Sequence, residues 1–239
     1  LSEDKFFEKA DAFALYPTVD GKYYTYQELF DKIKDNQTDK DGKLVILYAS
    51  DEDSQHSYIE AAKDKAYEVL LLDSPIVSHL MQKMESTKEN ITFARVDADH
   101  IDNLIKKDDT KISKLSEDQK KELETILKEA IPSEKFMVQL EAMDSDASPF
   151  IITQPEFMRR MKEMQATGGG MFGMGNMPEM YNLVVNTNSD LVGEILSTKT
   201  KKKQDRLISQ SLDLARLSQG LLKGKELSEF IKRSYEMIK

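Results

Sequence analysis

Three short, almost continuously apolar runs lie in the first half of the chain, at residues 43–49, 68–72 and 91–97. Runs of this length without polar alternation are typical of strands buried on both faces, as in parallel sheets. The stretches between them carry apolar residues at helical spacing. Because a strand, a helix and a strand follow one another repeatedly, the sequence predicts a small αβα sandwich with a short, mainly parallel sheet and right-handed crossovers.

Three helices are expected around this sheet, each marked by an apolar stripe. The first lies at 25–34 and the second at 57–66. For the third, we expect Ser74 to be the N-cap and Pro75 to occupy the first helical position. The residues that form the three stripes are Leu29, Ile33, Ile59, Ala62, Ala66, Ile76, Leu80 and Met84.

A polar stretch at residues 103–114 is predicted to separate two domains, residues 1–110 and 111–239. In the second domain, Ser116 to Gln119 form a capping box that opens a helix ended by Pro132. The further expected elements are strands at 136–142, 149–153 and 181–185, helices from Pro155, at 190–196, at 204–219 and at 225–238, and a basic loop at 197–203. The strand at 149–153 is expected to pair with the strand before it. The chain is therefore expected to be α/β, α+β overall, with a helical hairpin at its end.

Charge and residue inventory argue against several classes of protein. With 43 acidic and 34 basic residues, the net charge is −9, which argues against nucleic-acid binding. No apolar run approaches the roughly 20 residues of a membrane span. The first residues form no signal peptide and lack an initiator Met, so we expect an excised fragment of a longer protein. The absence of cysteine excludes disulfides and thiolate catalysis and fits a reducing compartment, the cytoplasm.

No catalytic residue, metal site or cofactor is predicted within the chain. Its three histidines, His56, His79 and His100, have no ligand-like spacing. The turn after the first apolar run, residues 50–54, holds three carboxylates and no glycine, so it is unsuited to a phosphate. A divalent cation there is an alternative, but consecutive acids in a loop are usually just solvated.

Methionine is concentrated in one segment: seven of the chain's 12 lie between Met158 and Met180. On a helix from Pro155, one face would comprise Phe157, Met158, Met161 and Met164, and the other Arg159, Arg160, Lys162 and Glu163. Methionine adapts to varied partners. The Gly/Met loop at 166–178 has too many glycines to pack Met171 and Phe172 into a core. We interpret this apolar surface as a binding site, the alternative being a helix packed on the neighbouring sheet.

The two apolar helices that close the chain need a cover for their shared face. Either they pack on the αβ unit before them, or a two-fold partner completes a four-helix bundle. The pattern does not distinguish these alternatives. If a partner copy completes the bundle, the dimer interface would consist of Leu207, Ile208, Leu212, Ala215, Leu227, Phe230, Ile231 and Ile238, with Leu214 and Leu217 widening the same face.

Several stretches in this order resemble one known family. They are Tyr23 to Glu28, Tyr67 to Asp73, Ser148 to Thr153 leading into a Met-bearing helix, and Leu217 to Leu222 followed by Phe230 to Arg233. Together they are similar to the C-terminal half of the ninety-kilodalton heat-shock chaperone family, bacterial HtpG type. The resemblance covers nearly the whole chain.

The resemblance implies two domains with different roles. Residues before about 110 would be the distal part of the family's middle domain, and the rest its C-terminal dimerisation domain. ATP and Mg would bind an upstream domain of the parent protein, outside this chain. The last two helices would form a homodimer, and non-native client proteins would contact 157–164 and the helix around His79 and Leu80. The Gly/Met loop is longer than is typical, so a client role for Met171 and Phe172 is not implied by the family.

Two other classes of function remain as alternatives. A Met-rich targeting module would bind apolar helical segments such as signal helices, and would be expected beside a GTPase motif that the sequence lacks. A hydrolase would need a nucleophile and base that the residue inventory does not supply. The sequence therefore favours a chaperone fragment that dimerises and binds non-native proteins.

Overall fold

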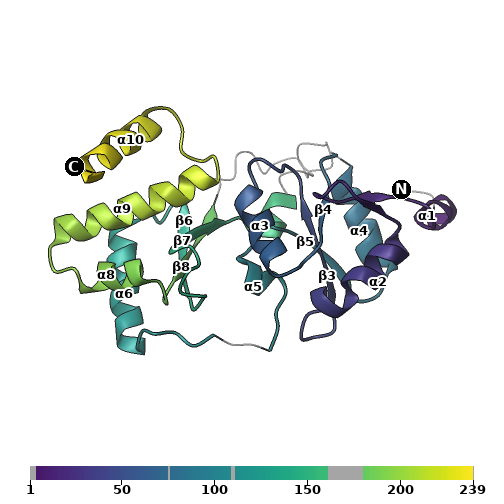
Figure 1. The fold of residues 1–239 in the computed structure, drawn as a ribbon, viewed down its shortest axis with the longest axis horizontal. Helices are drawn as coiled ribbons and strands as arrows, with labels where there is room; N and C mark the ends of the chain where they lie inside the picture. Colours follow the sequence, from purple (N-terminus) through teal and green to yellow (C-terminus); the bar gives the residue numbers. More distant parts are fainter. Residues whose placement is uncertain (1–3, 75, 109–110, 161–179, 239) are drawn as a thin grey trace. The chain divides into compact units, whose positions relative to one another are not determined.

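The computed structural model describes residues 4–74, 76–108, 111–160 and 180–238 (Figure 1). Its architecture is mixed, with helices and small sheets in both halves. The chain divides into two compact units, residues 1–108 with 155–175, and residues 109–154 with 176–239. The start of the methionine-rich segment therefore groups with the first unit, whereas the sequence placed it in a domain of residues 111–239.

The first unit is built on a three-stranded parallel sheet. Its elements are α1 (Asp4–Asp11), β1 (Tyr16–Pro17), β2 (Tyr23–Tyr24), α2 (Tyr26–Gln37), β3 (Leu44–Ala49), α3 (His56–Asp64), β4 (Val69–Leu71), α4 (Val77–Thr87), β5 (Ile91–Arg95) and α5 (Ile101–Leu104). Strand β3 lies between β4 and β5 and is parallel to both. The three predicted strands and their parallel order are confirmed.

Helices cover both faces of this sheet, because β3 is apolar on both. Figure 1 shows α3 and α5 on one flank of the sheet and α2 and α4 on the other. Every residue of β3 is buried. Ile46 and Tyr48 pack in a cluster with residues of α2 and α4, while Leu47, between them, points to the opposite face. On α3, Ile59 and Ala62 are buried, so the αβα sandwich predicted for this half is present.

Helix α4 begins later than the sequence predicted. Its N-cap is Ile76, not Ser74, and no side chain caps it. The Ser74 carbonyl instead accepts a hydrogen bond from the Val77 N–H, in a turn that precedes the helix. Pro75 lies outside the described residues. The buried stripe is consequently Val77, Met81 and Met84, and Ile76 is 59% exposed.

Helix α3 also ends two residues earlier than predicted. The sequence extended the helix to Ala66 and included that residue in the apolar stripe. The helix ends at Asp64, and Ala66 follows it with a φ of 55°, a left-handed conformation that takes it out of the helical stripe.

The second unit holds a mixed three-stranded sheet covered by helices. Its elements are α6 (Glu117–Ala130), β6 (Phe136–Glu141), β7 (Phe150–Thr153), β8 (Tyr181–Asn186), α8 (Asp190–Ser197), α9 (Lys201–Ser218) and α10 (Gly224–Ile238). Strand β8 is central, parallel to β6 and antiparallel to β7. The expected pairing of the strand at 149–153 with the preceding strand is therefore wrong. The last four residues of β8 are all buried, which suits the centre of a sheet better than its edge.

Two predicted signals at helix ends in the second unit are confirmed. The capping box at Ser116 and Gln119 is present, and Gly220 and Gly224, with φ of 62° and 58°, separate α9 from α10. The prediction of a basic loop at 197–203 is partly wrong, because α9 already begins at Lys201. Lys201 pairs with Glu129 at 3.1 Å, so a carboxylate of α6 partly offsets the positive charge of the first turn of α9.

Candidate functional site

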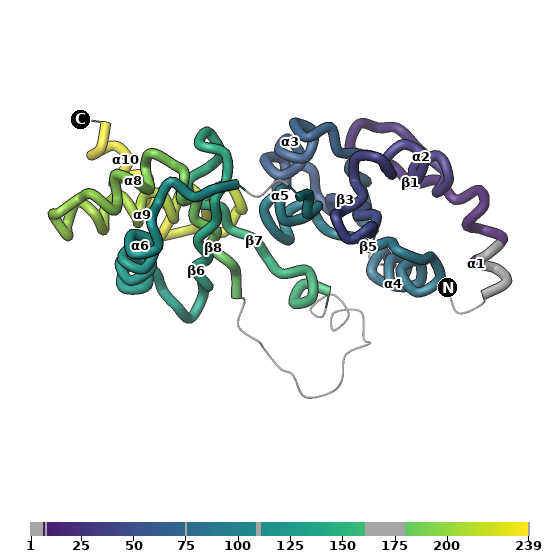
Figure 2. The backbone as a smooth tube through the Cα atoms, turned by 90° about the horizontal axis from the view of Figure 1, so that it is seen from below, coloured from purple at the N-terminus to yellow at the C-terminus, as the bar shows by residue number. Residues whose placement is uncertain are grey.

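Residues 156–160 are helical and follow β7 after a short connection (Figure 2). Glu156 is the centre of their attachment to the first unit. Its carboxylate accepts hydrogen bonds from the Tyr48 hydroxyl at 2.8 Å and from Arg160 Nε at 2.7 Å. Arg159 Nη2 lies 2.5 Å from the same carboxylate, and the guanidinium also donates to the Tyr48 hydroxyl. Because Tyr48 belongs to the central strand β3, these side chains tie the helical turn to the sheet.

The same turn covers an outer edge of that sheet. Arg160 donates to the Phe93 carbonyl of β5 at 3.0 Å and to Glu85 Oε2 at 2.8 Å. Glu85, on α4, accepts the Phe93 N–H at 2.7 Å, and the Arg95 N–H donates to Glu156 at 3.4 Å. Unpaired groups on an edge strand invite another chain to add to the sheet. Side chains from two helical segments therefore close the β5 edge.

The electrostatics of this cluster keep Glu156 ionised. Burial by itself raises the pKa of the Glu156 carboxyl, but the guanidiniums of Arg159 and Arg160 outweigh it and hold the pKa below its ordinary value. Burial raises the pKa of the Tyr48 hydroxyl, which therefore stays protonated and able to donate. Removing one partner of such a buried ion pair typically costs about 3–5 kcal/mol, because the other charge is left uncompensated.

The described part of the methionine-rich helix presents its apolar side outward. Phe157 is 71% exposed and Met158 is half-buried, whereas Arg159 is only 5% exposed. The sequence had assigned Arg159 and Arg160 to the charged face of this helix, opposite Phe157 and Met158, and these two arginines are the side chains that attach the segment. The other residues predicted for this surface, Met161, Met164, Met171 and Phe172, lie outside the described residues.

The attachment cluster was missed by sequence reasoning, although part of its signal was present. Glu156 precedes Arg159 and Arg160 by three and four residues, the spacing at which opposite charges meet on a helix. The partners on β3, α4 and β5 could not be read from that spacing. Their selection depends on which surface the helical turn meets.

Helix α4 carries the other two residues that the resemblance assigns to clients. His79 is exposed, and Leu80 is half-buried at the margin of the first unit's core. Both side chains are therefore at least partly accessible to solvent.

The terminal hairpin buries much of its predicted interface within its own unit. Ile208, Leu212 and Ala215 belong to the core that α9 forms with α6, α8 and the sheet. Phe230 is also buried. These four side chains have little surface to offer a partner, and for the three on α9 the reason is that they pack on the αβ layer before the hairpin. Leu207 and Leu227 are half-buried.

Apolar surface nevertheless remains on both helices of the hairpin. The exposed large apolar side chains are Leu214, Leu217, Ile231, Tyr235, Met237 and Ile238. Of these, Ile231 and Ile238 were among the residues assigned to the dimer interface. A polar cluster joins the two helices: Asp213 of α9 pairs with Arg233 of α10 at 2.5 Å and with Arg216 at 3.0 Å. The hairpin is thus held together partly by charge and exposes large apolar side chains on both helices.

The acidic turn after β3 uses its own side chains to satisfy its backbone. Gln55 Oε1 accepts the N–H groups of Ser50 and Asp51 at 2.8 and 3.0 Å, and Asp51 Oδ1 accepts the Ser54 N–H at 2.7 Å. The hydrogen bonds from Ser54 lower the pKa of the Asp51 carboxyl. Within the described ranges, no group of three or more histidine, aspartate or glutamate residues is arranged to hold a metal ion. None of the helices described is long and apolar enough to cross a membrane.

Comparisons with known proteins agree over residues 16–239, and the relatives match the whole chain. The family model described as Hsp90 protein matches residues 16–239. The chain is 36% identical, over 305 aligned positions, to a protein of Bacteroides fragilis (strain YCH46) named chaperone protein htpG. It is 35% and 33% identical to proteins named chaperone protein HtpG from Bacteroides thetaiotaomicron and Porphyromonas gingivalis (strain ATCC 33277). Each alignment covers 100% of this chain and 45% of the relative, so the chain spans about half the length of these curated relatives.

Proposed function

Because the chain belongs to the Hsp90 protein family, we propose that it is the part of a chaperone that holds non-native client proteins and pairs with a second copy of itself. The relatives' names and the order of the resembling stretches support this proposal. We place the chain in the C-terminal half of an HtpG-type protein, with residues 1–110 as the distal middle domain and 111–239 as the dimerisation domain. A chain without cysteine suits the cytoplasm.

The observation that carries the client-binding proposal is the orientation of Phe157. This aromatic side chain is 71% exposed, although Arg159 and Arg160, two and three residues later, are anchored in the first unit. Exposed apolar surface usually marks an interaction site. The anchor prevents Phe157 and Met158 from turning inward, so they stay available to apolar segments of other chains. Met161 and Met164, one and two turns further along the sequence, would extend the same strip.

Phe157→Ser combined with Met158→Ser tests this proposal. The fold should lose less than about 1 kcal/mol, since Phe157 is mostly in solvent and Met158 is half-buried. Suppression of aggregation of a heat-denatured client enzyme should fall in the same protein. A thermal melt beside a light-scattering assay measures both. A large drop in melting temperature, with holding activity lost only in proportion to unfolding, would make these residues part of the core.

Phe13→Ser is a matched control, because Phe13 is the same residue type in the same unit and is also 71% exposed. It removes an equal aromatic surface outside the strip. Holding activity should stay at the level of the unchanged chain. If Phe13→Ser and the strip variant lose activity equally, holding depends on general hydrophobicity and the strip has no special role.

Dimerisation would place two strips in one assembly. We assign the exposed apolar residues of α9 and α10, among them Leu214, Ile231 and Ile238, to the contact with the partner copy. A two-fold related hairpin would cover it and complete a four-helix bundle. Each strip would hold a client weakly, and pairing would raise the effective concentration and therefore the avidity.

We also propose that this chain by itself does not bind ATP, which would be held by another part of the parent protein. Phosphates bind to free backbone N–H groups at a βα turn. In the turn after β3 the N–H groups of Ser50, Asp51 and Ser54 are already taken by side chains. Calorimetric titration with Mg-ATP should give no heat of binding. A dissociation constant in the micromolar range would contradict the proposal.

A further inference from the structure

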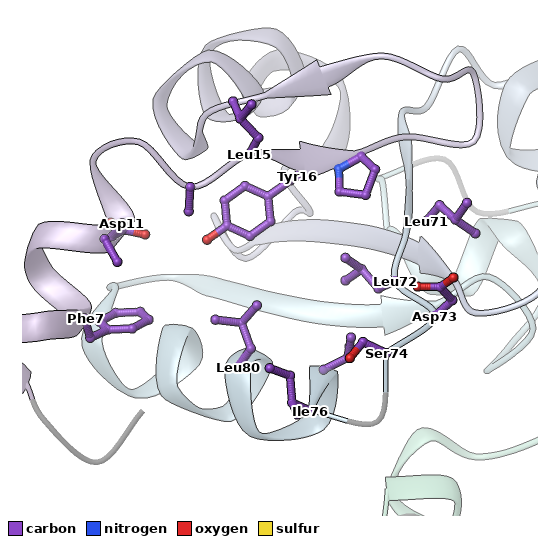
Figure 3. Close-up of a pocket in the computed structure, with 14 residues that line it drawn as sticks. Phe7, Asp11, Leu15, Tyr16, Leu71, Leu72, Asp73, Ser74, Ile76 and Leu80 are labelled. Atoms are coloured by element: carbon purple, nitrogen blue, oxygen red, sulfur yellow. The ribbon is translucent and has the colours of Figure 1, made fainter.

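A cavity of about 480 Å³ opens on the first unit between α1, β1, the end of β4 and the start of α4. Figure 3 shows Phe7 and Asp11 at one end of it and Asp73 with Ser74 at the other, with the Tyr16 ring between them. Its size lies within the range of about 300–1,000 Å³ typical of ligand sites. It is separate from the strip that begins at Phe157, and no residue of that strip lines it.

The apolar face of α4 extends beyond the part that the sheet covers, and the cavity lies against this extension. Val77, Met81 and Met84 occupy the side of α4 that meets the sheet. Ile76 and Leu80 widen the face beyond what the sheet covers, and both line the cavity. Ile76 remains 59% exposed. An apolar face that its own domain does not cover is surface left for another molecule.

The polar groups at the two ends are acidic. Asp11 Oδ2 accepts a hydrogen bond from Lys88 Nζ at 2.5 Å, but Asp11 Oδ1 is buried and has no hydrogen-bond partner among the described residues. At the other end, Asp73 is exposed and forms no ion pair within the part of the chain that the structure describes. The Tyr16 hydroxyl is engaged with Met84 Sδ at 3.5 Å. The cavity thus offers an apolar centre and, at the Asp73 end, a negative charge that no described residue pairs with.

We propose that this cavity binds a short extended peptide segment, with one large apolar side chain in the cavity and a basic residue beside it. The basic side chain pairs with Asp73. The inference rests on the proposed function and sharpens it, since it names the client segments this unit selects: apolar residues flanked by lysine or arginine.

A peptide series tests the charge selection. Fluorescent peptides with the same leucine–phenylalanine centre, flanked by lysine, serine or glutamate, are titrated into the full 239-residue chain and followed by anisotropy. The lysine-flanked peptide should bind most tightly. Asp73→Lys should weaken its binding by about fivefold or more and should improve binding of the glutamate-flanked peptide, because the sign of the pairing is reversed. Equal affinities for the three peptides would overturn the proposal.

Asp53→Lys is the matched control for charge, because Asp53 is also exposed, lies in the same unit and does not line the cavity. It changes the net charge by the same amount and should leave the order and spread of the three affinities unchanged. If it shifts them as much as Asp73→Lys does, the selection comes from the field of the whole acidic chain and the cavity is not the site.

Filling the cavity tests the apolar centre. Ala14, which lines the cavity, is replaced by Phe, which occupies the space without adding charge. Binding of the lysine-flanked peptide should fall by about tenfold, and thermal stability should not fall if the ring enters the cavity. Should Ala14→Phe unfold the unit, Ile76→Ser replaces it, with Ile112→Ser as the control at an 87% exposed position of the second unit. Undiminished binding in a folded cavity variant overturns the inference.

The outcomes also separate this inference from the proposed function. If the cavity variants bind peptide normally while the Phe157 and Met158 variant loses aggregation suppression, the cavity assignment is wrong and the chaperone proposal stands. If peptide binding depends on the cavity but the chain suppresses no aggregation, the site exists and the chaperone proposal fails. If the lysine-flanked peptide does not bind at all, the cavity proposal is wrong.

Discussion

Two helical regions of this chain expose apolar side chains, and they are attached to their units in opposite ways. Residues 156–160 attach through charge: Arg159 and Arg160 meet Glu156, Glu85 and the edge of β5, and Phe157 points away. Helix α9 attaches through apolar residues that join the core of the second unit. Its apolar face is wide enough that Leu214 and Leu217 still remain exposed.

The difference shows what an amphipathic pattern leaves open. A helix with one apolar and one charged face has two surfaces that can meet the protein. Burial of the apolar face is favoured by the hydrophobic effect, at roughly 25 cal/mol for each Å² removed from water. Burial of the charged face needs a receiving set of opposite charges and hydrogen-bond partners. The first unit supplies that set through Tyr48, Glu85 and the open β5 edge.

The largest expected effect contrasts two positions of the terminal hairpin. Leu212→Asp puts a carboxylate into the core of the second unit and should lower its free energy of unfolding by about 4 kcal/mol. Ile231→Asp, at an exposed position, should change it by less than about 0.5 kcal/mol and should separate the proposed dimer into monomers. Urea unfolding and sedimentation velocity measure the two effects. An Ile231→Asp protein that stays dimeric would place the interface elsewhere.

The charged attachment in the first unit should respond to loss of one partner. Glu156→Gln leaves Arg159 buried without its counter-charge, and we expect the free energy of unfolding of the first unit to fall by about 3 kcal/mol. Glu52→Gln, at an exposed position in the same unit, serves as the control and should have almost no effect. Limited proteolysis should detect release of residues 155–160 in the first variant only. Equal stability of both variants would show that the cluster is not what holds this segment.

Acid should weaken the charged attachment and spare the apolar one. The pKa of Glu156 is lowered in the folded state, so its stabilising effect is complete above the ordinary glutamate pKa of about 4.3 and is lost as the pH falls through the lowered value. The stability difference between the unchanged chain and Glu156→Gln should therefore shrink below about pH 4.3. The stability difference between the unchanged chain and Leu212→Ala should stay the same over this pH range, because it does not depend on the ionisation of Glu156. Unfolding in urea at neutral and acid pH measures both differences.

The smallest predicted effects test whether the two units unfold separately. Thr25 caps α2 in the first unit and Ser116 caps α6 in the second, each within a capping box. Replacing either by Ala should cost about 1 kcal/mol. Hydrogen exchange should show the loss only in the unit that carries the change. If one substitution speeds exchange in both units, they share one cooperative transition.

Much of the local structure was predictable because its causes lie within a few residues. The apolar run at 43–49 is a central strand because it has no polar alternation, and Ser116 with Gln119 starts α6 because side chains and backbone amides satisfy each other locally. Prediction failed where two local signals competed. Ile76 and Val77 both fit an apolar stripe of α4, and the sheet contacted the second.

Sequence by itself therefore determined the parallel αβα sandwich, the helical hairpin and the exclusion of cysteine chemistry. The tertiary structure decided which faces are buried and which strands pair. It placed β8 between β6 and β7, and it attached residues 156–160 by their arginines. The physical reason is that strand order and buried faces depend on partners distant in the sequence, such as the carboxylate of Glu85 and the edge of β5. Periodicity describes a helix or strand alone and does not contain those partners.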